Sequence, residues 1–447
     1  MKRTLPKRKI SRRNREQGIV IVLVAVFMLF VVGAMAALSI DVVTLYTARS
    51  EAQLAADSAA LAAARVLANS GATSDTGATL GLMPQAQLLA QNVALQVAEQ
   101  NQVGGAYLTA ANVSAPVFGG NPPTNPTVTV SVQANLPTFF ARIWGTKFVT
   151  VGASATAEAY NPSAPSLLST GGGTPVAPLC VKPWLLPNLD PTSAVGGTIF
   201  NATTGAITNS ALLGWSSITA TPTPKPMTLA CTGGNCSGAL TPAAWSYFPG
   251  DPNTTFPPPT TALPTCTQIS TLTPYQASVA GCIQTPISCN VNIANIDTIN
   301  YSMRSSDTAY AVNCLTHDTT FGGGDTVTTT NPPTTPFQFV AGADNPVVLS
   351  GAMNAGTDIT VSDSLVTVPV FDNSNGTVLA TGNQLVGFVQ LFLNPDSTPA
   401  DPTSITGNVN TTIVNLAGCG TNATGQPILG NGASPVAVRL ISPPTPP

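Results

Sequence analysis

The sequence predicts an α+β protein: a single N-terminal transmembrane helix that continues into a soluble helix and an antiparallel sheet, followed by a disulfide-bearing, mainly β C-terminal region. Three observations favour this fold class. A basic tail precedes an uncharged apolar run, an alanine-rich helical pattern follows that run without a break, and short β-branched runs separated by Gly, Pro and Asn fill much of the remainder. Because only 8% of the residues are charged, we expect the neutral, loop-rich surfaces that are typical outside the cytoplasm.

Residues 1–17 form a basic tail that holds eight of the sixteen Lys and Arg residues. A basic tail can indicate binding to nucleic acid or anionic lipid, but this one directly precedes an uncharged apolar run at residues 18–40. That run is long enough to span about 30 Å of hydrocarbon. The positive-inside rule then places the tail in the cytoplasm and the rest of the chain across the membrane, and no nucleic-acid partner is expected.

A cleaved signal peptide is the alternative interpretation of this run. Ala34 and Ala36 offer a small-x-small cleavage site after an apolar core of suitable length. The apolar character continues to Ile40, however, and the helical pattern continues beyond it without turn residues that would extend the chain for a peptidase. We therefore favour a retained anchor, whereas cleavage near Ala36 would yield a secreted or surface-attached β-rich adhesin.

Residues 41–68 predict a helix because they contain no Pro or Gly and are rich in strong helix formers. The sequence Asn69-Ser70-Gly71 then supplies the usual chemistry of a helix C-terminus. Small faces let helices approach closely, and one face of this helix is small throughout. Its members, at three- and four-residue spacing, are Ala52, Ala55, Ala56, Ala59, Ala60 and Ala63.

The ordered polar positions of this helix resemble the N-terminal domain of TadE/TadG-like Flp pilus-assembly proteins. In that family a basic tail and a Gly open a membrane helix, which is followed by an Asp-Val-(x)-x-Leu-Tyr step, an Arg, a Gln and an alanine block around an Asp. The positions that match are Gly18, Asp41, Tyr46, Arg49, Gln53 and Asp57. An ordinary alanine-rich stalk that spaces a domain from the membrane is the plainer interpretation of the same residues.

The resemblance implies a structural role in pilus assembly at the bacterial inner membrane, not an enzyme. It implies that the partners are the lipid bilayer and other Tad/Flp pilus proteins, such as pilins and pseudopilins, or further copies of the chain. We expect the small-residue face of the helix over residues 18–68 to pack against those helices, with Asp41, Arg49 and Asp57 setting the register.

Two departures from related proteins limit what the resemblance implies. Leu23 stands where substrates of prepilin peptidase carry a Glu, so processing at Gly18 is not expected. The Asp-x-Ser-x-Ser pentapeptide of von Willebrand A-type domains, which larger TadG proteins often carry, is absent from the sequence. No metal-dependent adhesion site is therefore predicted.

Residues 41–160 are expected to form one pilin-like αβ unit. A second helix is predicted over residues 82–100, and β runs follow over residues 106–118, 127–134 and 147–159. The apolar face of the second helix would be Leu82, Ala86, Leu89, Val93 and Val97.

The connection between the last two β runs has an unusual composition. Residues 136–145 gather Phe139, Phe140, Ile143 and Trp144 around Arg142. This segment also resembles the TadE/TadG pattern, and an ordinary core turn is an equally good interpretation.

A linker rich in Pro, Gly and Ser is expected at residues 161–178. Beyond it, residues 179–336 form a loop-rich, cysteine-containing region, and residues 337–447 form a β-rich C-terminal domain. The β runs expected in that domain are residues 346–350, 364–371, 377–382, 385–394, 411–416 and 436–442, with a turn at Asn375-Gly376.

All eight cysteines lie on the predicted outer side of the membrane, where the environment favours disulfides. Zinc is the alternative, but the sequence has no Cys-x-x-Cys and a single histidine. Eight cysteines allow about 105 pairings, among which the sequence does not choose. The candidates are Cys180, Cys231, Cys236, Cys266, Cys282, Cys289, Cys314 and Cys419.

A catalytic site is not predicted. His317 beside Asp318 has the chemistry of a general base, and many serines are available as nucleophiles. No nucleophile elbow, phosphate loop or metal-binding helix motif accompanies them, and a lone histidine in a Gly-flanked loop is more often a turn residue. We expect no enzyme activity, cofactor or metal, and an extracytoplasmic hydrolase is the least favoured interpretation.

Overall fold

The structure is a computed structural model, and it divides into two compact units that are described in turn. One unit comprises Met1–Ala56, Ala98–Ser114 and Ser131–Ser154, and the other comprises Asp57–Val97, Ala115–Val130 and Ala155–Pro447. The residues described are 13–163, 176–190, 197–215, 248–249, 276, 279–281, 286–289, 292–293, 311–318, 322–328, 333–372, 383–395, 409, 411–419, 428–429 and 434–441.

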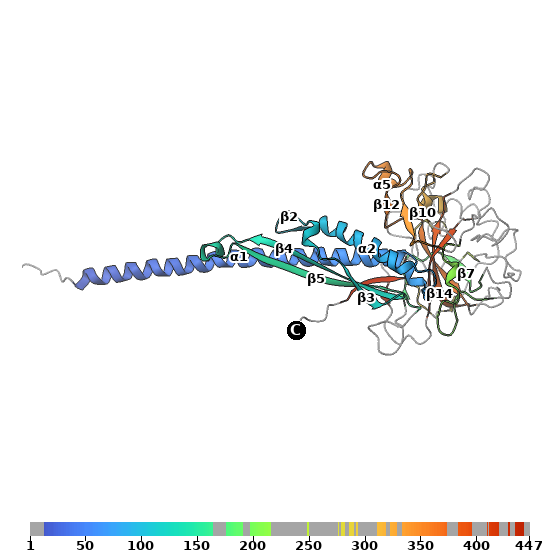
Figure 1. Ribbon diagram of the computed structural model, residues 1–447, viewed down its shortest axis with the longest axis horizontal. Helices are drawn as coiled ribbons and strands as arrows, with labels where there is room; N and C mark the ends of the chain where they lie inside the picture. Colours follow the sequence, from blue (N-terminus) through green and yellow to red (C-terminus); the bar gives the residue numbers. More distant parts are fainter. Residues whose placement is uncertain are drawn as a thin grey trace, which may run out of the picture. The chain divides into compact units, whose positions relative to one another are not determined.

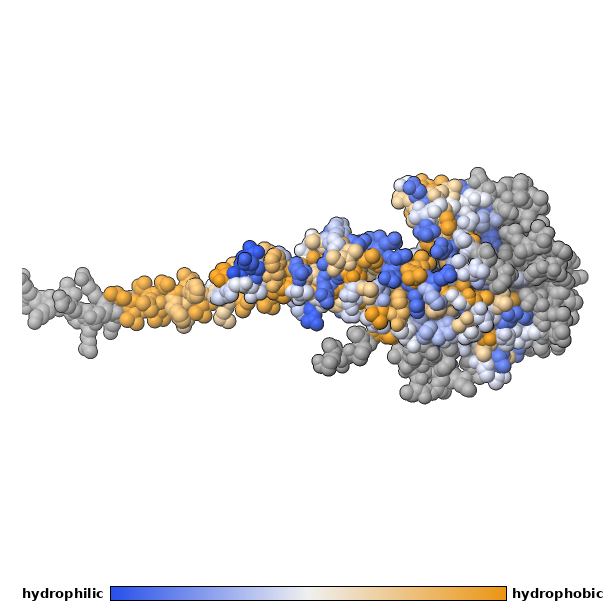
Figure 2. All heavy atoms as spheres, in the orientation of Figure 1, coloured by the Kyte–Doolittle hydropathy of each residue, from blue (hydrophilic) through white to orange (hydrophobic). Residues whose placement is uncertain are grey.

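A single long helix, α1 (Arg13–Asn69), contains both the apolar run and the alanine-rich segment (Figure 1). It is continuous because neither Pro nor a turn cluster interrupts it. Large apolar side chains from Ile19 to Ile40 are exposed on every side of the helix, and Figure 2 shows this stretch as an apolar surface. Among the described residues, α1 is the one helix that is long and apolar enough to cross a membrane.

In the first unit, a β hairpin lies along α1 (Figure 1). Its strands are the outer parts of β4 (Asn125–Pro137) and β5 (Phe148–Tyr160), which are hydrogen-bonded neighbours, and its tip contains η3 (Ala141–Trp144). The Ser131 hydroxyl donates to the Ser154 hydroxyl across the two strands at 3.1 Å. The smaller elements of this unit are β1 (Gln102–Val103), β2 (Ala106–Tyr107) and η2 (Ala110–Asn112).

In the second unit, η1 (Ala72–Ser74) and α2 (Leu82–Glu99) follow α1. The Asp75 carboxylate accepts from the backbone N–H groups of Thr79, Leu80 and Gly81, which fixes the approach to α2. The buried face of α2 differs from the expected one, because Leu89, Val93 and Val97 are only half-buried. The fully buried positions lie four residues apart: Leu82, Ala86, Ala90, Ala94 and Ala98.

The inner part of the hairpin belongs to a four-stranded sheet of order β17-β5-β4-β3. Strand β3 (Val117–Asn121) is the neighbour of β4 in sequence, but β17 (Ala437–Ile441) comes from the end of the chain. It pairs antiparallel with β5, with Ala437 opposite Tyr160. The segment expected as a C-terminal domain therefore contributes a strand to the sheet of the expected αβ unit.

The main sheet of the second unit has the order β15-β14-β13-β7-β8, with β9 also paired to β14. Its pairs are antiparallel except β13 with β7, which is parallel. Every residue of β13 and β15 is buried, so both faces of these strands are covered. The strands are β7 (Trp184–Pro187), β8 (Phe248–Pro249), β9 (Asn292–Ile293), β13 (Leu365–Phe371), β14 (Asn383–Leu393) and β15 (Thr411–Gly418).

Smaller elements surround this sheet. Strands β10 (Thr326–Thr328), β11 (Gln338–Val340) and β12 (Asp358–Ile359) form an antiparallel sheet, and β6 (Val176–Ala177) pairs in parallel with β16 (Ile428–Leu429). A 3₁₀ turn, η4 (Ser210–Leu212), lies between β7 and β8 in the sequence. The largest fully buried side chains of the unit include Trp184, Trp215, Tyr160, Phe200, Phe371, Phe388 and Phe392.

One predicted strand is wrong. Residues 346–350 were expected to be β, but Pro346–Leu349 forms the short helix α5. The Asn345 side chain accepts from the Val347 N–H as an N-cap, and Pro346 occupies the first helical position, where it needs no donor. These two local signals outweigh the β preference of Val347 and Val348. The expected strand at 377–382 and the Asn375-Gly376 turn lie outside the described residues.

Buried polar side chains connect the C-terminus of α1 to β15. The Asn415 amide donates to the Ala68 carbonyl at 2.7 Å and to the Gln390 side-chain oxygen at 2.6 Å. The Ser74 hydroxyl donates to the Leu416 carbonyl and accepts from the Leu416 N–H. A helix C-terminus leaves carbonyls without intrahelical partners, and here the sheet supplies a donor.

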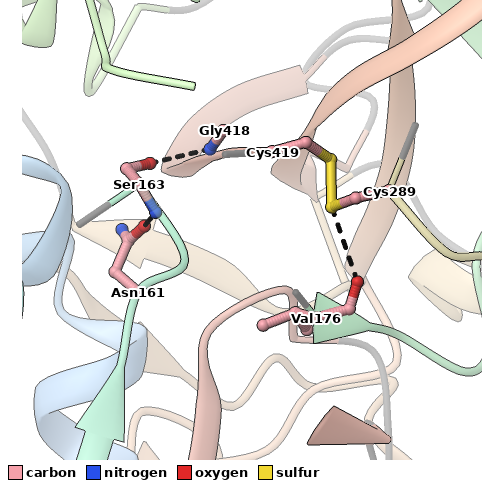
Figure 3. The surroundings of a disulfide bond; sticks show 6 residues. All are labelled: Asn161, Ser163, Val176, Cys289, Gly418 and Cys419. Atoms are coloured by element: carbon pink, nitrogen blue, oxygen red, sulfur yellow. Dashed lines mark hydrogen bonds between the residues drawn. A yellow bond between two sulfur atoms is a disulfide. The ribbon is translucent and has the colours of Figure 1, made fainter. Parts of the chain in front are cut away.

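A disulfide joins Cys289 to Cys419, which follows β15 directly (Figure 3). Cys419 packs in a buried cluster with Val181, Leu385 and Phe388, and the sulfur of Cys289 lies 3.6 Å from the Val176 carbonyl oxygen. Cys180 and Cys314 are also disulfide-bonded. The C-terminal region is therefore disulfide-bearing, as expected, while Cys231, Cys236, Cys266 and Cys282 lie outside the described residues.

The start of the expected linker is held in the same region (Figure 3). The Asn161 amide donates to the carbonyls of Thr73 and Leu416, and the Gly418 N–H donates to the Ser163 hydroxyl at 2.7 Å. At the other end of the segment, β6 lies in a sheet with β16. These contacts place both described ends of residues 161–178 within folded structure.

Candidate assembly surface on the membrane-proximal helix

Asp41 is the first charged residue after the apolar run, and it is almost fully buried, with 3% of its surface exposed. Its carboxylate accepts three backbone hydrogen bonds from the hairpin tip. The donors are the N–H groups of Phe139, Phe140 and Ala141, at 2.8, 3.0 and 2.7 Å. Asp41 thus caps the backbone that leads into η3, up to its first residue Ala141, and fastens the hairpin tip to α1.

The environment of Asp41 favours the charged carboxylate. Burial raises its pKa, but the three backbone donors, together with the positive charge of Arg142, outweigh burial and lower the pKa below its usual value. The carboxylate is therefore ionised at neutral pH, which strengthens its hydrogen bonds to the tip.

Two further contacts fasten α1 to the first unit. The Glu51 carboxylate accepts from the Gly104 N–H at 2.7 Å, and the Gln53 amide donates to the Ser154 carbonyl at 3.4 Å. Gly104 has a φ of +63°, a left-handed conformation in which glycine is favoured. No sequence pattern indicated the role of Glu51, because its partner is a backbone group 53 residues along the chain.

The small-residue face of α1 is not available to a partner beyond residue 48. Ala48 and the six alanines expected to contact other helices, from Ala52 to Ala63, are buried within the chain itself. This face therefore does not pack against equivalent helices in the soluble part of α1. Any such contact there must use another face of the helix.

A different face of α1 is open. Val42, Tyr46 and Arg49 follow at i, i+4 and i+7, so they share one side of the helix directly above the apolar run. All three are exposed, Tyr46 to 77%. Within the described part of the chain, the structure shows no hydrogen bond or ion pair to the Arg49 guanidinium. Of the other predicted residues, Asp57 is half-buried and Gly18 lies within α1.

Comparison with protein families identifies the segment that contains these residues. Residues 18–66 match the family described as "Putative Flp pilus-assembly TadE/G-like". The TadE/G-like segment covers the apolar run and almost all of the soluble part of α1, including every predicted motif residue. No curated protein and no solved structure matches the chain. The family match therefore concerns α1. The β-rich remainder lies outside the matched residues.

The hairpin tip is exposed, so the interpretation of residues 136–145 as a core turn is wrong. Phe139, Ile143 and Trp144 are all largely exposed, and Phe148 at the start of β5 is exposed as well. The tip lies outside the TadE/G-like match, but Asp41 within the match holds it.

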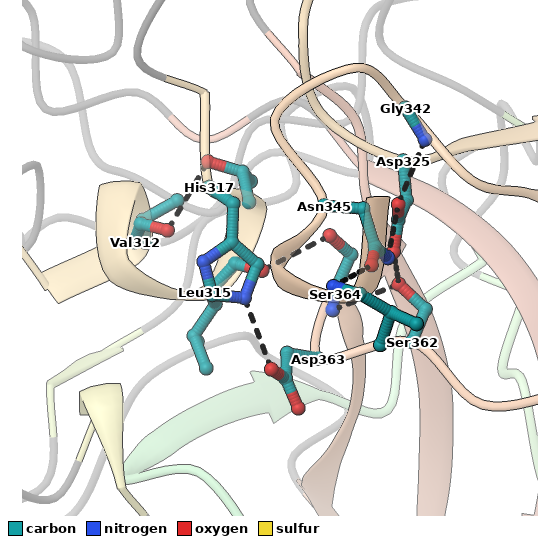
Figure 4. Close-up of polar contacts among 11 residues, drawn as sticks. Val312, Leu315, His317, Asp325, Gly342, Asn345, Ser362, Asp363 and Ser364 are labelled. Carbon is teal, nitrogen blue, oxygen red and sulfur yellow. Dashed lines mark hydrogen bonds and ion pairs between the residues drawn. The ribbon is translucent and has the colours of Figure 1, made fainter. Parts of the chain in front are cut away.

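His317, the residue with the chemistry of a general base, contacts the carboxylate of Asp363 (Figure 4). His317 Nε2 lies 3.0 Å from Asp363 Oδ2. The nearby serines bond elsewhere: Ser364 donates to the Leu315 carbonyl and Ser362 to the Asp325 carboxylate. Neither serine is paired with His317, so the described residues show no nucleophile and base in contact here.

A buried lysine near this aspartate was not anticipated from the sequence. Lys182 Nζ donates to the carbonyls of Val279, at 2.6 Å, and Gly281. Burial lowers its pKa to about 7, although the negative charge of Asp363 acts in the opposite direction. A lone lysine in an apolar stretch carries no sequence signal of burial.

No group of three or more His, Cys, Asp or Glu side chains in the described ranges is placed to hold a metal ion.

Proposed function

We propose that the chain is a membrane-anchored structural component of Flp/Tad-type pilus assembly and not an enzyme. The apolar run of α1 spans the bacterial inner membrane, the basic tail lies in the cytoplasm, and the remainder lies in the periplasm or outside the cell. The observation that carries this proposal is the open face of Val42, Tyr46 and Arg49, which lies directly above an exposed apolar run within the TadE/G-like segment.

The contact would be made by α1 with helices of pilins, pseudopilins or further copies of the chain. Within the bilayer, the exposed apolar run supplies packing surface on every side. At the membrane surface, Tyr46 offers an aromatic anchor and Arg49 a guanidinium that fits a carboxylate of a neighbouring helix. Since the buried alanines are occupied within the chain, the face around Arg49 is the surface that selects partners.

The test is a charge reversal on the open face. Arg49→Glu should abolish pilus formation in the source bacterium while the amount of protein in the membrane fraction stays unchanged. Arg65→Glu is the matched control, because Arg65 is also an exposed arginine of α1 but lies 16 residues, about 24 Å, farther along the helix. Normal pili in the Arg49→Glu strain would contradict the proposed role of this face.

The anchor itself is tested by the intact mass of the protein recovered from membranes. A mass that includes the apolar run supports the retained span. A protein that starts near Ala37 would lack the span, and the secreted adhesin would then be the better explanation.

A further inference from the structure

The exposed hairpin tip is the feature that the proposed function leaves unexplained. Phe139, Ile143, Trp144 and Phe148 are four large apolar side chains within ten residues, and all are exposed, Ile143 to 73% and Trp144 to 60%. Two cations, Arg142 and Lys147, lie among them and are exposed too. A soluble surface seldom gathers so many large apolar groups at the end of a hairpin.

The tip has a fixed place along α1. Gln53 contacts Ser154 of β5, whereas Asp41 contacts Phe139, Phe140 and Ala141. Figure 1 shows the hairpin lying along α1. These contacts place its tip at Asp41, which directly follows the apolar run. Because Asp41 is one residue beyond the run, a bilayer that contains the run has its headgroup region at the depth of the tip.

The tip is also held in one conformation. The Thr138 N–H donates to the Lys147 carbonyl and its hydroxyl to the Thr146 carbonyl, which closes the base of the loop. Gly145 ends η3 with a φ of +98°, a left-handed conformation in which glycine is favoured. The apolar side chains are thus presented on a closed loop and not on a frayed end.

We propose that the hairpin tip, residues 138–148, lies in the headgroup region of the same bilayer as a second point of membrane attachment. Tryptophan and phenylalanine prefer this region, and exposed arginine and lysine reach lipid phosphates from it. The two attachments, α1 and the tip, are joined through Asp41, so together they fix the rotation of α1 and hence the direction of the open face. The inference rests on the proposed membrane anchor.

Figure 2 shows the corresponding surface: apolar residues continue from the exposed stretch of α1 to the level of the tip, where strongly polar residues first appear. An apolar band that is followed along the molecule by aromatic and basic residues is typical of a membrane interface.

Tryptophan fluorescence in vesicles tests the position of the tip. The full chain is reconstituted in phosphatidylcholine and phosphatidylglycerol vesicles, with or without bromine atoms on the acyl chains near the headgroups. The emission of Trp144 is obtained as the difference between the native chain and Trp144→Phe. We expect brominated lipid to reduce this difference emission by at least half and aqueous iodide to leave it nearly unchanged.

A matched reporter comes from Tyr107→Trp in the Trp144→Phe background. Tyr107 is 65% exposed, lies in the same unit and pairs with Gln102 in the β1–β2 sheet. Gly104, in the turn of this sheet, contacts Glu51, which lies ten residues or about 15 Å beyond Asp41 along α1. The indole introduced there should be quenched by iodide and not by brominated lipid.

The outcomes separate the two proposals. If the chain floats with the vesicles after alkaline carbonate treatment but Trp144 behaves like the Tyr107→Trp reporter, the tip is in water and only this inference is wrong. If Trp144 is shielded from both quenchers, protein and not lipid covers the tip, which also overturns it. If the chain does not float, the anchor fails and the tip inference fails with it.

Discussion

At the scale of single residues, Asp41 has the most specific role. Its carboxylate accepts from the N–H groups of Phe139, Phe140 and Ala141, so removing it leaves these three donors of the tip without that partner. Asp41→Ala should therefore release the tip from α1, and amide hydrogen exchange at residues 139–141 should become at least ten times faster. Thr44→Ala is the control, since the Thr44 hydroxyl donates to the carbonyls of Ile40 and Asp41 within its own helix and not to the tip. Equal exchange in both variants would contradict the capping role.

Lys182 makes stability depend on pH in a defined direction. Its pKa is about 7 in the folded protein and 10.5 when unperturbed, so between these values the unfolded chain binds more protons. The free energy of unfolding should therefore fall as the pH decreases from about 10 to about 7, by up to about 1.4 kcal/mol per pH unit. Below pH 7 this contribution is constant.

Denaturant titrations of the detergent-solubilised chain at pH 7, 8 and 9 measure this slope. Lys182→Met should lose most of the slope, whatever its effect on stability at a single pH, because the titrating amine is gone. A native chain whose stability is flat over this range would show that Lys182 keeps an ordinary pKa.

At the scale of elements, the end of α1 depends on the absence of a side chain at Gly71. Its φ is +78°, and a Cβ would lie 2.6 Å from the Cε2 atom of Phe337 and 3.1 Å from the Val414 carbonyl. We expect Gly71→Ala to lower stability by about 1–2 kcal/mol through backbone strain and by a further 1–3 kcal/mol through overpacking.

Gly81→Ala separates these two contributions. Gly81 has a similar φ of +66°, but a Cβ there would meet open space. Thermal unfolding should show the larger loss for Gly71→Ala, and equal losses would mean that Phe337 moves aside without cost.

At the scale of the whole molecule, β17 connects the end of the chain to β5. Arg439 donates to the buried Glu158 carboxylate at 2.7–2.8 Å, from a position 281 residues later in the sequence. Removing the cation leaves a buried charge without its partner, so Arg439→Leu should cost about 3–5 kcal/mol.

The double variant Glu158→Leu with Arg439→Leu tests this explanation, because it removes the buried charge as well. Chemical unfolding should show that the double variant recovers most of the loss. A double variant as unstable as Arg439→Leu alone would indicate that the Arg439 side chain acts by packing, including its contact with the Tyr160 ring at 5.3 Å.

The parts of this fold that local sequence determines were predictable. The apolar run and the alanine block specify α1, and β-branched runs specify β4, β5, β13, β14 and β15. Pairings between distant segments were not predictable, because no local pattern indicates that β17 joins β5 or that β7 lies parallel to β13. At residues 346–350, an Asn-Pro helix start outweighed β propensity.

The candidate site was predictable in the same partial way. The family motif pointed to Asp41, Tyr46 and Arg49, but not to their different roles, since burial of Asp41 depends on a loop about 100 residues away. The alanine face was expected to contact helices of partner proteins, yet it is buried within the chain itself. Small residues favour the close approach of any helix or strand, including those of the same chain.

The position of β17 has a consequence for the order in which the fold forms during synthesis. Because the chain is made from its N-terminus, β5 is complete long before its neighbour β17 exists. With 281 residues between Glu158 and Arg439 and synthesis at ~5–20 residues per second, the delay is roughly 15–55 s. Throughout that interval one edge of the sheet is unpaired and the Glu158 carboxylate has no cation, so a chain that stops early cannot complete its fold. Completion of the sheet thus requires that synthesis has continued at least as far as β17.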